Sequence, residues 1–123
     1  MREIIFRGLN EDGQWEYGGF FIKDGQPAII NKTKEWSGAW VKPESVGQYT
    51  GLKDRNGKMV YEGDILRGID YENLDDPDIE IKPVRWDRSM FNWGYEPIND
   101  FDRDRLEIIG NIFETPELLE EAK

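Results

Sequence analysis

Carboxylates are the residues of this chain with the most evident chemical capacity. Asp75, Asp76 and Asp78 lie within four consecutive positions, and Ca²⁺ and Mg²⁺ both take oxygen ligands of this type. The spacing does not match the ligand pattern of an EF-hand loop, and Pro77 interrupts the run. We therefore interpret these acids as part of a solvated loop, with a specific cation site as the alternative.

A second pair of acids, Glu62 and Asp64, flanks Gly63. Acidic side chains commonly hydrogen-bond to the backbone of a tight turn, so we prefer that role to a catalytic one. The chain has no histidine to activate a serine and no cysteine to supply a thiolate. It contains neither a Walker-type phosphate loop nor a dinucleotide-binding glycine pattern. The sequence thus predicts a non-enzymatic protein with no catalytic residue and no cofactor.

Basic side chains gather weakly around two tryptophans. Lys82, Arg85 and Arg88 lie near Trp86 and Trp93 in the sequence, and basic residues beside aromatic rings can bind single-stranded nucleic acid by stacking. Acidic residues are interleaved with this group, and arginine packed against tryptophan is also an ordinary structural arrangement. Direct binding of nucleic acid is therefore disfavoured.

The overall charge points the same way. Twenty-six acidic against sixteen basic residues give a net charge of −10, whereas phosphate backbones are bound by Lys and Arg. The absence of cysteine excludes a disulfide-stapled secreted scaffold. The chain begins without an apolar signal region, and no stretch approaches the roughly 18 apolar residues of a membrane span. We expect a soluble cytoplasmic protein with no membrane partner.

Aromatic residues are unusually frequent, with five Trp, five Tyr and six Phe. Aromatic side chains favour half-buried pleated surfaces, so a compact β core is the first explanation. An aromatic contact surface is the alternative, because tryptophan is enriched where interfaces bury their anchors. The candidate interaction residues are Trp36, Trp40, Trp86, Trp93, Asp75, Asp76 and Asp78.

The elements that must position these residues begin with a meander. Strands are predicted at Glu3–Leu9, Trp15–Lys23 and Ala28–Asn31. The turn at residues 10–13 contains Asp-Gly, and Asp24-Gly25 is the strongest local hairpin signal in the chain. Residues 32–45 are predicted to be irregular, with a short strand near Ala39–Val41 and, as an open alternative, a helical turn at Pro43-Glu44-Ser45.

The middle of the chain is dense in turn residues. Strands are predicted at Val46–Thr50, Lys58–Tyr61 and Ile65–Ile69, separated by the turn 54–57 and the corner 62–64. Two corners this close together favour strands that bend around a small barrel or a sandwich edge. The residues assigned to turn geometry are Gly51, Asn56, Gly57, Gly63 and Asp64.

The last third is predicted from charge and periodicity. Six of the eleven residues 70–80 are acidic and none is basic, which predicts an exposed loop. Strands are expected at Ile79–Trp86, Phe91–Tyr95 and Leu106–Ile109, with a reversal at Arg88-Ser89. Thr115-Pro116-Glu117 is a helix-start pattern and predicts a short helix over residues 115–122.

Three blocks of sequence carry a family resemblance. Residues 1–7 read MREIIFR, residues 46–66 read VGQYTGLKDRNGKMVYEGDIL, and residues 109–119 read IGNIFETPELL. Together, and in this order, they resemble the YopX family of phage and prophage proteins. The resemblance implies a bacterial or phage origin, a mostly β domain and self-association as a homo-oligomer. It implies no catalytic residue.

The predicted fold is mainly β, and α+β only by its short C-terminal helix. We expect small twisted sheets with an SH3-like barrel portion around residues 46–98, by analogy with barrels in which a Gly-Asp corner precedes a strand and a hairpin follows. The chain is expected to be a single domain over residues 1–123. Within it, a meander 1–45 packs with a barrel-like part 46–113 and the helix 115–122.

The predicted function is protein–protein interaction or self-assembly, by a phage or prophage protein in the cytoplasm of a bacterial host. The expected partner is a host or phage protein, or a second copy of this chain. One alternative is an acidic inhibitor that mimics DNA and occupies a nucleic-acid-binding host protein, which the net charge and residues 70–80 motivate. A nucleic-acid-binding module is the second alternative.

Overall fold

The fold is mainly β, as the sequence predicts. The computed structural model describes residues 4–31, 37–70, 78–87, 90–93, 96–97 and 105–121. Within these residues lie eleven strands, one 3₁₀ turn and one five-residue α-helix. The chain divides into two compact units, Met1–Tyr49 and Thr50–Lys123. Each unit is described by itself below.

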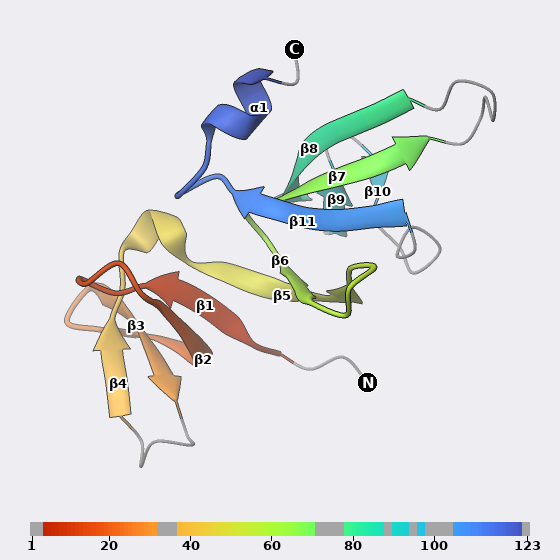
Figure 1. Ribbon diagram of the computed structural model, residues 1–123. Coiled ribbons are helices and arrows are strands. Elements are labelled where there is room, and N and C mark those ends of the chain that lie inside the picture. Colours follow the sequence, from red (N-terminus) through yellow and green to blue (C-terminus); the bar gives the residue numbers. More distant parts are fainter. Residues whose placement is uncertain are drawn as a thin grey trace. The chain divides into compact units, whose positions relative to one another are not determined.

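The first unit is an antiparallel sheet in the order β4-β3-β2-β1-β5 (Figure 1). The predicted Asp24-Gly25 hairpin is correct: both residues have positive φ, 53° and 79°, as the two central positions of a type I′ turn require. The strands of this unit are β1 Phe6–Leu9, β2 Trp15–Lys23, β3 Gln26–Asn31, β4 Ser37–Trp40 and the first residues of β5 Gly47–Lys53.

Between β4 and β5 the helical alternative for Pro43–Ser45 is the correct one, since these residues form the 3₁₀ turn η2. Ser45 is buried and connects this turn to β1. Its hydroxyl donates to the carbonyl of Lys42 at 2.6 Å and accepts the amide of Leu9 at 2.8 Å. The short strand predicted at 39–41 lies at Ser37–Trp40, and residues 32–36 are outside the described part.

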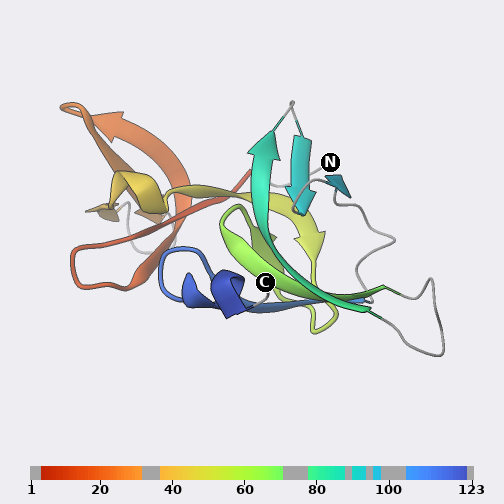
Figure 2. The same ribbon diagram turned by 90° about the horizontal axis from the view of Figure 1, so that it is seen from above.

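The second unit holds the end of β5, paired with β6, and an antiparallel sheet in the order β10-β9-β8-β7-β11. Figures 1 and 2 both show β11 beside β7, and Figure 2 shows how strongly β8 bends. The elements are β6 Met59–Tyr61, β7 Asp64–Asp70, β8 Asp78–Asp87, β9 Met90–Trp93, β10 Glu96–Pro97, β11 Leu106–Asn111 and the helix α1 Glu117–Glu121.

The core of this unit gathers around Trp93. Its indole packs among Val60, Leu66, Val84 and Leu106, and its Nε1 donates to the carbonyl of Leu66 at 3.1 Å. A buried tryptophan needs a partner for its N–H group, and this bond supplies it within the core.

Four expectations are changed by the structure. The SH3-like barrel around residues 46–98 is not confirmed, because both sheets formed by the described residues are open. Strand β5 does not end at Thr50 but continues through Gly51, whose φ is 90°. The predicted loop 70–80 is partly strand, since β7 includes Asp70 and β8 starts at Asp78, while residues 71–77 lie outside the description. The helix is shorter than predicted, beginning at Glu117.

Two turn glycines differ in what surrounds them, which predicts different costs of substitution. Gly57 has φ 80° with no heavy atom within 4 Å of an added Cβ, whereas at Gly63, with φ 96°, the Cβ would lie 2.8 Å from the Phe113 ring. We expect Gly57→Ala to lower the free energy of unfolding by about 1 kcal/mol, from backbone strain alone. Gly63→Ala should cost roughly twice that, because the Phe113 ring must also move. Urea unfolding of both variants measures the difference; equal losses would contradict the steric part.

Candidate interaction site

The acidic residues do not form a metal centre in the described part of the chain. No group of three or more His, Cys, Asp or Glu side chains there is arranged to hold an ion. Asp75 and Asp76 lie outside the described residues, and only the backbone of Asp78 is described, at the start of β8. No helix among the described residues has the length and apolar character needed to cross a membrane.

The acids of the Glu62–Asp64 corner contact backbone. Asp64 is buried, and its Oδ2 accepts the amide of Tyr61 at 2.8 Å. Glu62 lies on the other side of the corner, where its Oε2 accepts the amide of Trp86 at 3.3 Å. Asp64 therefore caps the backbone of its own turn, as we preferred, whereas Glu62 accepts a hydrogen bond from strand β8 instead.

Asp54 is a residue whose importance the sequence analysis missed. Its side chain is only 1% exposed. Oδ1 accepts the amides of Asn56 and Lys58, each at 2.9 Å, and Oδ2 accepts the amide of Ile108 at 3.0 Å. The first two bonds follow from an aspartate at the start of a turn, a signal that was available in the sequence. The third connects this turn to β11, fifty-four positions away.

The three candidate tryptophans that the structure describes differ in burial. Trp93 is 2% exposed and belongs to the core, so it is not a surface contact residue. Trp86 is 47% exposed and packs edge-on against Phe91, with ring centroids 4.6 Å apart. Trp40 is 42% exposed. Trp36 lies outside the described residues.

The basic residues near Trp86 do not assemble into one stacking face. The Nζ of Lys82 lies 4.5 Å from the ring centroid of buried Trp93, and it pairs with Glu80 at 3.2 Å. Arg85 and Trp86 are neighbours on β8, and successive strand residues point to opposite faces of a sheet. Arg88 lies outside the described residues. Arg85 therefore lies on the face opposite Trp86, whereas Lys82 lies on the same face as Trp86 but is paired with Glu80 and packs over the buried Trp93.

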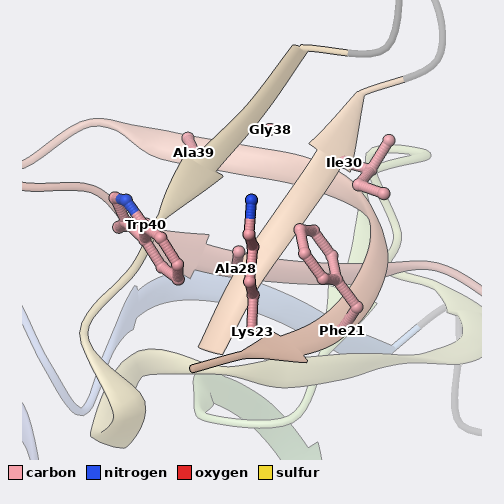
Figure 3. A pocket seen from close by; sticks show the side chains of 7 residues that line it. All are labelled: Phe21, Lys23, Ala28, Ile30, Gly38, Ala39 and Trp40. Carbon is pink, nitrogen blue, oxygen red and sulfur yellow. The ribbon is translucent and has the colours of Figure 1, made fainter. Parts of the chain in front are cut away.

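A hollow on the first unit surrounds the exposed Trp40. Strand register places Phe21, Ala28 and Trp40 in one row across β2, β3 and β4, and paired residues point to the same face. Ala28 is almost fully buried and forms the floor, while the two aromatic rings form walls (Figure 3). The volume is about 340 Å³, and we call this hollow the Trp40 slot; its lining is Phe21, Lys23, Ala28, Ile30, Gly38, Ala39 and Trp40.

Lys23 adds a positive charge to the Trp40 slot. Figure 3 shows its extended side chain between the rings of Phe21 and Trp40, with the amine at its far end. No described acidic residue forms an ion pair with this amine. A second hollow of about 300 Å³ also borders Trp40, which thus stands between two hollows; its lining is Glu11, Gln26, Pro27, Trp40, Val41, Lys42 and Pro43.

The backbone of β4 is open on one side. The amide of Val41 donates to the carbonyl of Pro27 at 3.2 Å, which makes Val41 and Pro27 a hydrogen-bonded pair. Along antiparallel strands, hydrogen-bonded pairs alternate with pairs that are not hydrogen-bonded to each other. Trp40 and Gly38 belong to the second kind, so their backbone N–H and C=O groups point away from β3. Among the described residues no strand pairs with that edge of β4. The Trp40 slot therefore lies directly beside backbone donors and acceptors that no described strand pairs.

Comparisons with known proteins give a family and a fold. A family model described as "YopX protein" matches residues 14–120 of the chain. A similar solved structure is the crystal structure of protein EF1440 from Enterococcus faecalis, with 22% sequence identity and a TM-score of 0.62. The similarity covers 97% of this chain and 99% of that one, and at this identity it supports the fold alone. No curated protein matches the chain significantly.

Proposed function

This chain belongs to the YopX protein family, and from that premise we propose that it is a non-enzymatic phage or prophage protein that acts by binding another protein. The observation that carries the proposal is the exposed Trp40, which lines an aromatic-walled slot beside a strand edge that no described strand pairs. Tryptophan is the residue most enriched at the energetic centres of protein interfaces. Exposed strand edges bind other chains readily unless charge, proline or a bulge blocks them. Ser37-Gly38-Ala39-Trp40 contains no charge and no proline.

Charge distribution also favours the first unit as the binding region. Residues 1–49 contain six basic and seven acidic side chains, a net charge of −1, whereas residues 50–123 contain ten and nineteen, a net charge of −9. The unit that carries Trp40 therefore has almost no net charge of its own to oppose an acidic partner.

Replacing Trp40 with alanine is expected to abolish partner binding while changing stability by less than about 1 kcal/mol, because the ring is already 42% exposed. The measurement is quantitative affinity capture from bacterial lysate with the unaltered protein, Trp40→Ala and Trp86→Ala. Trp86 is the matched control because it is similarly exposed, at 47%, on the other unit. Partners that Trp40→Ala captures as well as the unaltered protein would refute the assignment. Light scattering of the same proteins tests self-assembly.

The acid-rich residues 50–123 favour a second candidate, an inhibitor that mimics the charge of DNA. This candidate requires a captured partner that binds nucleic acid and that DNA displaces.

We further propose that the protein works in the cytoplasm of the bacterial host. The corner and hairpin of residues 46–98 are proposed to be SH3-like in local arrangement.

The protein itself is expected not to bind DNA. A net charge of −10 opposes approach to phosphate. Of the basic residues of β8, Arg85 lies on the face opposite Trp86, and the amine of Lys82 is paired with Glu80. Fluorescence anisotropy with labelled single-stranded and duplex oligonucleotides, at about 50 and 200 mM salt, checks this across the range where phosphate-driven affinity falls steeply. Micromolar binding at the lower salt that disappears at the higher would instead support the nucleic-acid-binding alternative.

A further inference from the structure

We propose that the Trp40 slot binds an extended, acidic peptide segment of the partner, which adds as a strand beside β4. One apolar side chain of the segment fills the slot, and a carboxylate near it pairs with Lys23. This inference rests on the proposed function and specifies the chemistry of the partner. Four features of the first unit carry it: the free backbone, the bare glycine, the apolar walls and the unpaired charge.

The backbone of β4 provides the affinity for a strand. Gly38 and Trp40 each direct one N–H and one C=O away from β3, a geometry inferred from the Val41–Pro27 hydrogen bond and the register. Peptides that add to a sheet edge bind by main-chain hydrogen bonds of this kind, and pockets for alternate side chains determine which sequence binds. The Trp40 slot is such a pocket, because Gly38, Ala39 and Trp40 of the edge strand β4 form part of its lining.

Gly38 provides the space for a side chain of the incoming strand. It carries no Cβ, and the nearest heavy atom to one built there is Cζ of Phe21, at 3.6 Å. A residue opposite Gly38 can therefore extend over the glycine toward Phe21 and Ile30, which line the same hollow. Aromatic side chains commonly cover a glycine on a neighbouring strand in this way. A hollow of about 340 Å³ lies at the small end of the range for ligand pockets and suits a single large side chain.

Lys23 determines the sign of the partner's charge. Its amine reaches the slot between two aromatic walls (Figure 3), and none of the described acids neutralises it. A carboxylate brought near the slot gains a charge-assisted hydrogen bond that a neutral peptide lacks. The register places Lys23 four positions along the strands from the row of Gly38, with the row of Trp40 between them. Since side chains two positions apart share a face of a strand, the acid is expected two or four positions from the apolar anchor.

A second copy of this chain fits the slot less well. If β4 paired with β4 of another copy, the slot would receive Ser37-Gly38-Ala39-Trp40, which brings a tryptophan and no carboxylate for Lys23. Charge complementarity therefore favours a separate acidic segment. Self-pairing is the competing outcome of the experiment below.

The test is selection from a displayed library of random eight-residue peptides on the unaltered protein, with Gly38→Leu as the counter-selection target. The leucine side chain occupies the slot, and the variant should fold because the added Cβ meets only ordinary contacts and φ is not positive. Its melting curve checks this. The expected winners carry a large apolar residue with Asp or Glu two or four positions away.

Three measurements on a synthesised winner then decide the proposal. Gly38→Leu should weaken binding at least tenfold, and Lys23→Gln a few-fold to about tenfold, the latter effect shrinking at high salt. N-methylation along the peptide should reduce binding at every second amide, because alternate amides of an added strand face β4. Winners without acids, no alternation, or binding unaffected by Gly38→Leu would each overturn it.

The remaining outcomes separate this inference from the function on which it rests. If light scattering finds a dimer that Gly38→Leu dissociates, a second copy occupies the slot and the peptide proposal is wrong. If lysate capture depends on Trp40 but the library yields no such peptides, protein binding stands and strand addition fails. If the library yields no such peptides and lysate capture does not depend on Trp40, the proposed protein-binding function and the strand-addition proposal both fail.

Discussion

Replacing Asp54 with alanine is expected to lower the free energy of unfolding by about 3 kcal/mol, which corresponds to a fall in melting temperature on the order of 10 °C. The carboxylate accepts the backbone amides of Asn56, Lys58 and Ile108 while almost fully buried. A hydrogen bond to a charged group contributes roughly 1.5–3 kcal/mol. The turn amides of Asn56 and Lys58 can bond to water in the variant, so the sum is smaller than three full bonds.

Two further substitutions make the Asp54 prediction specific. Asp54→Asn keeps one oxygen that can accept hydrogen bonds, but the NH₂ group that replaces the second carboxylate oxygen can only donate. We therefore expect this variant to be more stable than Asp54→Ala and less stable than the unaltered protein. Asp12→Ala removes an acid from an exposed turn and should change stability by no more than about 0.5 kcal/mol. Urea unfolding of the three variants provides the comparison. Similar small losses for all three would mean that β11 is held without the Asp54–Ile108 bond.

Gly68→Ala is expected to destabilise the second unit by about 3 kcal/mol. A Cβ at this position would lie 2.5 Å from Cη2 of Trp93 and 2.8 Å from Cδ2 of Leu106. Overpacking a core costs about 1–3 kcal/mol. Displacing the indole also weakens the bond from its Nε1 to the Leu66 carbonyl, worth about 1 kcal/mol. The φ of Gly68 is not positive, so backbone conformation does not require glycine there. Glycine is required because the indole ring of Trp93 packs directly against the backbone of β7 at this position.

A smaller ring provides the decisive control for Gly68. Trp93→Phe loses the indole hydrogen bond and apolar area, but it removes the two indole atoms that the new Cβ would approach, which leaves only the contact with Cδ2 of Leu106. The double variant Gly68→Ala with Trp93→Phe should therefore be more stable than the sum of the two single losses predicts, by at least about 1 kcal/mol. Gly19→Ala is the matched glycine control, since no heavy atom lies within 4 Å of its added Cβ. Additive losses in the double variant would rule out the Gly68–Trp93 contact as the cause.

Local features of the fold follow from the sequence because short-range geometry determines them. Asp24-Gly25 forms the hairpin that it predicts, since two consecutive residues with positive φ suit few other residue types. Gly57 and Gly63, assigned to turn geometry, have positive φ in turns, whereas Gly51 has positive φ inside β5. The mainly β character follows from the spacing of such turns, which leaves segments of strand length between them.

The family resemblance also came from the sequence, through the blocks at 1–7, 46–66 and 109–119, and a family match over residues 14–120 agrees with it. Strand boundaries were less accurate: β8 extends back to Asp78 because pairing with β7 outweighs the acidic composition that predicted a loop. Composition reports only the average polarity of a segment, whereas a ladder of backbone hydrogen bonds can extend through polar residues.

Only the tertiary structure decided which tryptophans are buried. Trp40, Trp86 and Trp93 each lie in a segment predicted to be a strand, yet Trp93 is in the core and Trp40 is exposed. A side chain's burial depends on which strand pairs beside it and on what covers that face, and both are long-range properties. The same reason explains why the Asp54–Ile108 bond and the Phe21–Ala28–Trp40 row were absent from the sequence analysis: their partners come from separate strands that meet only in the folded sheets.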